Sequence, residues 1–433
     1  MAVWSSRIKE SPSDIMKRVN NSLAIDIRLL PFDARLTLAW GEEISRLGIL
    51  NEKELGAMKK ALPLIVKKYS GHGELPDDED VHSLIERELT EAAGNVGRKI
   101  HLGKSRNDQV VTGLMMFLKE SVTSVKRSLL ALGLALTESA EKNTSVVMPG
   151  YTHLRQAQPV RFSHYLLSFA AMVEEDIRRL DSYTENELSE CPLGSGAFAG
   201  TTLKIDRDSL AKKLGFKNAS LNSIKSVSDR AFVISLASIL SIIAMHLSRY
   251  AEDLVIWSGC EFGFLELPAS TTTGSSMMPQ KKNPDSLELI RALTGRTNAA
   301  LTGLLTISKG VPLTYAKDLQ DDKRFIFDSI DAVYDGVRLF TEVIEGAKFR
   351  ADKMTSSIET AALATDAADL LVSEGIPFRQ AYEKVASNIE GIKELNITPE
   401  SSVERRGAKG GTSRSSVKEQ ISYFRKVFDS MSS

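Results

Sequence analysis

The sequence predicts an all-α fold, with a long central helical bundle flanked by two smaller helical domains. Two observations carry this prediction. Apolar residues recur at helical spacing over stretches of more than twenty residues, and alternating runs such as "TTLKID" are too short to propose a sheet. A chain of 433 residues is also long enough for about three domains of roughly 150 residues each.

Three segments predict the long helices. The first covers residues 109–142, and the second covers residues 163–188. The third, residues 230–259, contains no proline and would be roughly 40 Å long at about 1.5 Å per residue. The apolar residues that place one face of the first helix against a core are Val110, Leu114, Phe117, Leu118, Val122 and Val125.

The domain boundaries are expected near residues 105 and 355. The segment "GKSRND" opens the long helices at the first boundary, and the segments become shorter after the second and end in the glycine-rich "RRGAKGGTSRSS". The predicted domains are therefore an N-terminal helical domain (1–104), a central long-helix bundle and oligomerisation domain (105–355), and a small C-terminal helical domain (356–433).

Composition narrows the class of protein. Fifty-five basic and 56 acidic residues give a net charge of −1, so there is no global electrostatic case for a nucleic-acid or anionic-membrane partner. Two cysteines cannot build a disulfide framework, and the start of the chain lacks the apolar core of a signal peptide, so a cytoplasmic protein is expected. The apolar stretch 231–248 is interpreted as a buried core helix, because it stands alone and contains four serines.

The segment "TTTGSSMMPQKKNPD", residues 271–285, differs from its apolar surroundings. It combines hydroxyls with Lys281 and Lys282, and Asn283, Pro284 and Asp285 form a helix-start signal with Asn283 as the N-cap. A loop before a helix N-terminus favours an anion, and the lysines add positive charge. The segment lacks Walker spacing, so it is not a P-loop, and a plain polar surface loop remains the alternative.

Four further polar blocks interrupt the apolar pattern: "EDVHSLIE", "GKSRNDQ", "PGYTHLRQAQP" and "YAKDLQDDK". With the signature Gly-Ser-Ser-x-Met-Pro-x-Lys-x-Asn, matched throughout by residues 274–283, they make the chain resemble the argininosuccinate lyase family of the fumarase/aspartase superfamily. The resemblance implies that superfamily's fold and a β-elimination that splits argininosuccinate into arginine and fumarate. It also implies a homotetramer in which three subunits build each active site, without metal or cofactor.

The resemblance also implies roles for individual residues. Ser275 would be the base, Lys281 and Asn283 would stabilise the aci-carboxylate intermediate, and Thr152 and His153 would face the leaving side, with Glu288 orienting His153. Preorganised cations at a carboxylate suit that chemistry. The expected substrate contacts are Ser22, Asp26, Ser105, Arg106, Asn107, Tyr315, Gln320 and Lys323.

Alternatives stay open beside these roles. Ser275 could simply turn its loop, His153 could pack in a loop, and His82 could equally be a neighbour of the substrate or a buried structural residue. The same signature serves adenylosuccinate lyase, aspartase and fumarase, and a crystallin-like structural protein could use the same scaffold. No Cys, His or Asp spacing suggests a metal site.

Six positions depart from the family's pattern, and none of them is a proposed catalytic residue. They lie in the blocks "HLGKSRNDQ", "LRQAQP", "YAKDLQ" and "FRQAY" and are Leu102, Lys104, Arg155, Gln156, Ala316 and Tyr382.

Overall fold

The computed structural model describes residues 12–71 and 73–432 and confirms the all-α fold class, since its strands are only two to seven residues long. The prediction that the start of the chain is not a signal peptide rests partly on residues 1–11, which lie outside the described residues. The chain forms two compact units. Unit 1 contains Met1–Thr123, Leu180–Ser238 and Asn298–Ile330, and unit 2 contains Ser124–Arg179, Ile239–Thr297 and Asp331–Ser433. The domain boundaries near residues 105 and 355 stay predictions.

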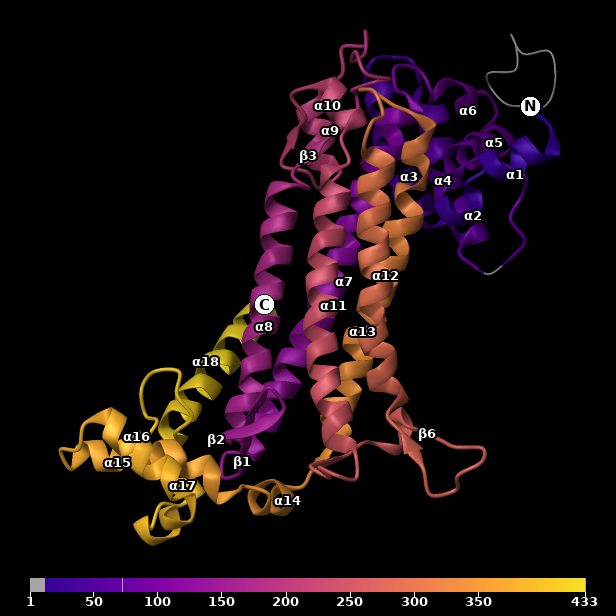
Figure 1. The fold of residues 1–433 in the computed structure, drawn as a ribbon. Helices are drawn as coiled ribbons and strands as arrows, with labels where there is room; N and C mark the ends of the chain where they lie inside the picture. The colour runs from indigo at the N-terminus through magenta and orange to yellow at the C-terminus, as the bar shows by residue number, and fades with distance from the viewer. Residues whose placement is uncertain (1–11, 72, 433) are drawn as a thin grey trace. The chain divides into compact units, whose positions relative to one another are not determined.

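Five long helices contribute segments to both units (Figure 1). The third predicted helix is observed over nearly the expected range, and the first two begin within three residues of the expected positions. The observed bounds are α7 (Arg106–Lys142), α8 (Phe162–Asn186), α11 (Ala231–Ser258), α12 (Asp285–Ser308) and α13 (Asp322–Gly346).

Unit 1 contains the N-terminal helices, whose starts follow local capping chemistry. Asn51 and Glu54 form a reciprocal capping box at α4, and the Asp80 side chain accepts the Ser83 N–H at the start of α5. Trp40, on α3, is fully buried in the core of this unit. The elements of this unit are α1 (Asp14–Asn20), α2 (Leu23–Asp26), η1 (Ile27–Leu29), α3 (Leu30–Arg46), α4 (Glu52–Tyr69), α5 (Val81–Ala93), α6 (Asn95–Lys99), β3 (Glu190–Cys191), α9 (Arg207–Lys213), β4 (Asn218–Ala219), α10 (Ser223–Ser228) and η3 (Lys317–Asp321).

Within unit 2, segments of the long helices pack through aromatic side chains. Phe169 on α8 stacks on Tyr250 of α11 at 3.8 Å between ring centroids, and it meets Phe340 of α13 edge-on at 5.5 Å. Gly336 on α13 leaves room for Leu293 of α12, because a Cβ there would lie 2.2 Å from that side chain. These contacts fix the helices against one another by close packing.

An antiparallel hairpin in unit 2, β1 (Val147–Thr152) and β2 (Arg155–Arg161), was not predicted from the sequence. Pro149, Gly150 and Pro159 disrupt the alternating pattern that would reveal it, and the register shifts between Pro149 and Tyr151. The hairpin matters because its tip carries Thr152 and His153.

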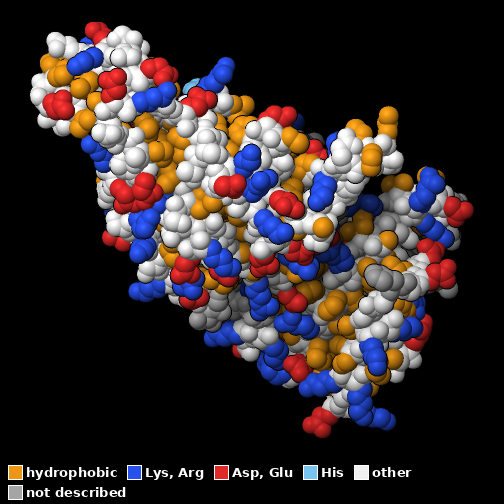
Figure 2. All heavy atoms as spheres, turned by 90° about the horizontal axis from the view of Figure 1, so that it is seen from below, with side chains coloured by type: hydrophobic (Ala, Val, Ile, Leu, Met, Phe, Trp, Pro, Cys, Tyr) orange, Lys and Arg blue, Asp and Glu red, His pale blue; other side chains and the backbone are white. Residues whose placement is uncertain are grey.

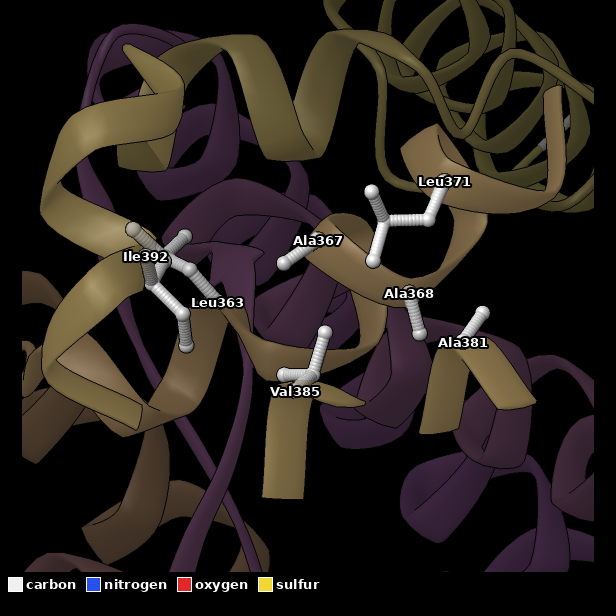
Figure 3. Packing of buried hydrophobic residues seen from close by; sticks show 7 residues of the cluster. All are labelled: Leu363, Ala367, Ala368, Leu371, Ala381, Val385 and Ile392. Atoms are coloured by element: carbon white, nitrogen blue, oxygen red, sulfur yellow. The ribbon is translucent and has the colours of Figure 1, made fainter. Parts of the chain in front are cut away.

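The other short elements of unit 2 lie around the ends of the long helices and in the C-terminal part. Seven buried residues form the hydrophobic core of that part, and Figure 3 shows them converging from several short helices: Leu363, Ala367, Ala368, Leu371, Ala381, Val385 and Ile392. The elements are β5 (Leu265–Glu266), η2 (Ala269–Thr271), β6 (Thr273–Gly274), β7 (Lys282–Asn283), β8 (Lys348–Phe349), α14 (Ala351–Ser356), η4 (Thr360–Leu363), α15 (Ala364–Ser373), α16 (Phe378–Ser387), η5 (Ile389–Leu395), α17 (Pro399–Glu404) and α18 (Arg414–Ser432).

Helix α11 is long and apolar enough to cross a membrane by length and composition. Half of its most apolar window is buried, and its Tyr250 packs against Phe169, as expected for a core helix. On the face shown in Figure 2, basic and acidic side chains are interspersed, with hydrophobic side chains exposed between them. Neither sign of charge dominates that face, which agrees with the net charge of −1.

Candidate active site

A pocket of about 150 Å³ in unit 1 brings together residues that are far apart in the sequence. Seven of the eight predicted substrate contacts line it. The lining residues are Ser22, Asp26, Glu79, Asp80, His82, Arg106, Asn107, Val110, Tyr315, Lys317, Gln320 and Lys323. The eighth, Ser105, lies beside it at the start of α7, where its Oγ accepts the Asn107 N–H at 3.2 Å. The eight predicted substrate contacts therefore lie in or beside one cavity.

Asp26 has an incompletely hydrogen-bonded carboxylate in this pocket. The residue is 3% exposed, Ser22 Oγ donates to Oδ2, and Oδ1 accepts no hydrogen bond from the described residues. Burial raises the pKa of Asp26, although the Lys323 ammonium, 3.8 Å from Oδ1, acts to lower it. A buried carboxylate oxygen without a partner is costly unless a ligand supplies a donor.

Lys323 belongs to a buried chain of charges behind the pocket. Its Nζ lies 3.3 Å from Asp322 Oδ1, and Asp322 Oδ2 accepts from Arg230 Nε at 2.7 Å. Burial acts to lower the pKa of Lys323, but the two neighbouring carboxylates raise it above its ordinary value. The ammonium is therefore kept charged and fixed in position.

Arg106 faces an acidic wall of the same pocket. Its Nη1 lies 3.2 Å from Glu79 Oε2 and 3.1 Å from Asp80 Oδ2. Burial acts to raise the pKa of Glu79, but a hydrogen bond from Asn20 and the nearby Arg106 charge hold it below its usual value. Both contacts use Nη1, and within the described part of the chain the other N–H groups of Arg106 remain for a carboxylate.

His82 is a buried residue of this pocket. It lines the pocket, yet it is 6% exposed and its Nδ1 lies 3.0 Å from Asp33 Oδ1. Burial opposes the charged imidazole, but the Asp33 carboxylate and other acidic neighbours raise the pKa of His82. Gln109 Nε2 donates to the same Asp33 oxygen at 2.7 Å and fixes it. The sequence also missed Glu79 and Lys317, which belong to polar blocks but to no catalytic motif.

Unit 2 carries the six predicted catalytic residues, and the hairpin tip holds two of them. Thr152 pairs with Arg155, so His153 and Leu154 form a two-residue turn. Both turn residues lie in the left-handed region, with φ of 53° and 57°. Such turns favour glycine or asparagine, and each non-glycine residue in a sparsely populated region costs about 1–3 kcal/mol. His153 is exposed and has no hydrogen-bond partner among the described residues.

Ser275 lies in the exposed signature loop between β6 and β7. Its Oγ accepts hydrogen bonds from the backbone N–H groups of Met277 at 3.3 Å and Met278 at 3.0 Å. This is the turn-forming role that the sequence left as an alternative. The same two donors also favour a serine alkoxide, because hydrogen bonds to a charged form stabilise it. Geometry therefore permits both roles at once.

The other three predicted catalytic residues follow along the same loop and helix. Lys281 is exposed, and Glu288 on α12 lies 4.0 Å from Arg291. The predicted N-cap is off by one residue: the Glu288 N–H bonds to the Pro284 carbonyl and the helix begins at Asp285. Asn283 instead pairs with Thr273 in β6–β7, because the Asp285 side chain accepts the Thr273 N–H and so holds the loop in this register.

Comparison with known proteins assigns this arrangement to a family. A family profile described as "Lyase" matches residues 6–298, and one described as "Argininosuccinate lyase C-terminal" matches residues 361–403. The argininosuccinate lyase of Caldanaerobacter subterraneus subsp. tengcongensis is 47% identical over 384 residues, which cover 88% of this chain and 87% of that protein. The chain belongs to the argininosuccinate lyase family. The argininosuccinate lyase of Thermoanaerobacter pseudethanolicus is 46% identical over 92% of this chain and 90% of its own length.

The fold is similar to that of a solved lyase structure. A variant of EDDS lyase with bound fumarate superimposes with a TM-score of 0.84 at 26% identity, covering 96% of this chain and 88% of that chain. The fold is therefore the all-α fold of the fumarase/aspartase superfamily, as the sequence predicted. Within the part of the chain that the structure describes, no group of three or more His, Cys, Asp or Glu side chains is arranged to hold a metal ion.

The six departures from the argininosuccinate lyase pattern fall in different environments. Lys104 is 8% exposed, and burial lowers its pKa. Leu102 is 49% exposed. Tyr382 is 61% exposed, and its ring lies beside that of Phe378. Arg155 is exposed on β2, whereas Gln156 bonds to the backbone beyond α14. Nothing in the structure explains Ala316, which directly precedes η3.

Proposed function

We propose that this lyase splits argininosuccinate into L-arginine and fumarate, a reaction of arginine biosynthesis. The observation that carries the proposal is the unit 1 pocket, where Asp26 offers a buried carboxylate oxygen that accepts no hydrogen bond from the described residues. A guanidinium such as that of the arginine portion would supply the missing donor. The curated relatives named argininosuccinate lyase and the fumarate in the EDDS lyase structure support the same reaction.

The chemistry follows from the charge that the reaction creates. Removing a proton beside a carboxylate makes a dianionic aci-carboxylate before the C–N bond breaks. In our proposal Ser275 takes that proton, and Lys281 with Asn283 stabilises the dianion. The two N–H donors to Ser275 Oγ support this role, since serine is a weak base unless its alkoxide is stabilised.

The leaving nitrogen needs a proton as the C–N bond breaks. In our proposal Thr152 and His153 face this side of the substrate, and Glu288 orients and polarises His153. The exposed hairpin tip supports this placement, because His153 is held out from the fold with both ring nitrogens available. A histidine is suited to proton transfer near neutral pH.

The substrate would be held by the eight predicted contact residues. Arg106 retains N–H groups suited to a substrate carboxylate, and Lys323 adds a fixed ammonium. Asp26 would take the guanidinium, assisted by polar side chains around it. The proposed contacts are Ser22, Asp26, Ser105, Arg106, Asn107, Tyr315, Gln320 and Lys323.

We further propose a cytoplasmic homotetramer with composite active sites, working without metal or cofactor. In it the "SRNDQ", "YTH" and "GSSMMPQKKN" blocks at each site come from three different subunits. Exposed apolar side chains on the long helices support association: Leu289 is 64% exposed, Leu305 52% and Met245 39%. Burying such residues between subunits would release their apolar surface from water.

A substrate panel tests the proposed reaction. Argininosuccinate, adenylosuccinate, malate and aspartate are each offered to the purified protein, and fumarate is followed by its ultraviolet absorbance. We expect fumarate only from argininosuccinate, with an equal amount of arginine. Fumarate from a different substrate would assign another lyase of the superfamily, and no fumarate from any of them would favour a structural role.

A further inference from the structure

The backbone of the hairpin tip that carries His153 is strained, because neither turn residue is a glycine or an asparagine. His153 and Leu154 both have positive φ, and Leu154 is 75% exposed, so it gains little from burial. Residues in such conformations persist only when the surrounding structure determines them. The question is which contacts hold this tip.

Gln156, on β2 near the tip, bonds to residues outside the hairpin. Its Nε2 donates to the Ser357 carbonyl at 2.8 Å, and its Oε1 accepts the Glu359 N–H at 3.1 Å. The amide therefore uses both ends, as a peptide group does in a sheet, and its orientation is fixed by the two partners. Gln156 pairs across the hairpin with Tyr151, the residue directly before Thr152.

The partners of Gln156 belong to a packed part of unit 2. Glu359 directly precedes η4, and Leu363 at the end of η4 belongs to the hydrophobic core shown in Figure 3. Tyr151 also packs edge-on against Phe262 at 5.7 Å. The residues next to the turn are thus tied to the segment before η4 through Gln156 and to Phe262 through Tyr151.

The base of the hairpin is anchored separately. Arg161 is fully buried, and its guanidinium reaches Glu400 at 3.0 Å and the Thr144 carbonyl at 2.8 Å. Thr355 Oγ1 donates to the Val147 carbonyl at 3.1 Å. Arg161 and Thr355 hold the ends of the strands that are farthest from the turn, so the contacts close to the tip are those of Gln156 and of Tyr151 with Phe262.

We propose that Gln156 is a positioning residue that sets the orientation of His153 by clamping the hairpin to residues 357–359. The inference rests on the proposed function, because it gives His153 a task that requires precise placement. It also gives a purpose to one of the positions where this chain departs from the family's pattern, since an amide with both a donor and an acceptor suits the two backbone partners.

Kinetics of Gln156→Leu test the clamp first. Leucine keeps the size of the side chain but removes both bonds. We expect kcat to fall roughly 10- to 100-fold, as for a small misplacement of a catalytic group, while KM for argininosuccinate stays within about twofold. Thr355→Val is the matched control: it removes one bond to the base of the same hairpin and should keep wild-type kcat. An unchanged kcat in Gln156→Leu, or a loss confined to KM, would overturn the proposal.

Subunit mixing then separates positioning from general damage. Gln156→Leu is refolded together with Ser275→Ala, and in parallel with His153→Asn. With Ser275→Ala, some composite sites combine an intact hairpin from one chain with an intact Ser275 from the other, so activity should return. With His153→Asn every hairpin is defective, so activity should not rise above that of Gln156→Leu alone.

The outcomes separate the clamp from the proposed function. If Gln156 is needed for folding, activity should return in neither mixture. If it acts through the signature loop, activity should return in the mixture with His153→Asn. Either result overturns the clamp. Absence of lyase activity in the wild-type protein would instead remove the proposed function. If His153→Asn and Ser275→Ala fail to complement each other, the composite site is wrong, and the kinetics of Gln156→Leu alone decide the clamp.

Discussion

The Ser275 hydroxyl oxygen accepts the backbone N–H of Met278 at 3.0 Å, with a second N–H, that of Met277, at 3.3 Å. The side chain is therefore an acceptor held by its own loop rather than a free hydroxyl. Two donors aimed at one oxygen stabilise negative charge on it, which is the property that a serine base needs.

Removal of this oxygen is the first prediction. Ser275→Ala should lower kcat by about 10²- to 10⁴-fold, the range typical of a lost general base. Argininosuccinate should still bind, because the proposed contacts lie in the unit 1 pocket. Steady-state kinetics and equilibrium binding on the correctly assembled variant check both statements. Near-normal turnover would remove Ser275 from the role of base.

Lys281→Met keeps the length of the side chain and removes its charge. If Lys281 stabilises a dianion that exists only after proton removal, the loss should appear in kcat, by about 10²- to 10³-fold, with little change in KM. Lys282→Met is a neighbouring control, since Lys282 is also exposed but has no proposed role. A change confined to KM would show that Lys281 only binds the ground state.

Asp26→Asn tests the proposed guanidinium contact. The carboxylate is buried and one oxygen accepts no hydrogen bond from the described residues, so its neutral replacement should weaken binding by about 2 kcal/mol, or roughly 30-fold in KM. Asp318→Asn makes the same change at an exposed carboxylate in η3 and should leave KM unchanged. Equal KM values for Asp26→Asn and the wild-type protein would place the guanidinium elsewhere.

His82 should make stability depend on pH. Its folded pKa is raised above the ordinary value of 6.5 by the Asp33 carboxylate, against the effect of burial. The charged pair therefore stabilises the fold fully below pH 6.5, and this contribution is lost as the pH rises through the folded pKa. The difference in urea midpoint between the wild-type protein and His82→Gln should shrink as the pH rises from 6.5 through the folded pKa.

A matched histidine has a shift of the opposite sign. Burial lowers the pKa of His164, against a hydrogen bond that its Nδ1 donates to the Gln420 amide oxygen, so His164→Gln should not reproduce that trend. A His82→Gln difference that grows with rising pH would contradict the assignment of His82 as a charged partner of Asp33.

The long helices could be predicted because their apolar period repeats over many turns. Helix α11 is observed from Ala231 to Ser258, within the predicted segment 230–259. The β1–β2 hairpin could not be predicted, because two prolines and a glycine break the alternation of apolar and polar residues. Its turn also uses His153 and Leu154 instead of glycine or asparagine. The N-cap before α12 was misplaced by one residue, since Asn283 pairs with Thr273 instead.

The residues of the pocket could be predicted only where the family resemblance named them. Resemblance to the family pointed to Asp26, Arg106 and Lys323, which lie up to about 300 residues apart, and folding brings them to one pocket. Glu79 and Lys317 were not found in this way, because the resemblance named no substrate contact at either position, although both lie in its polar blocks. The clamp formed by Gln156 depends on backbone groups of residues 357 and 359, which side-chain patterns do not encode.

The most direct test of the shared active site is complementation between His153→Asn and Ser275→Ala. Each variant refolded alone should be inactive, because every site lacks one catalytic group. Refolded together, mixed tetramers should contain some sites with His153 from one chain and Ser275 from another, and fumarate release from argininosuccinate should return to a fraction of the wild-type rate. Mixed tetramers that demonstrably form and yet stay inactive would show that both residues act within one chain, contrary to the composite site proposed for this lyase.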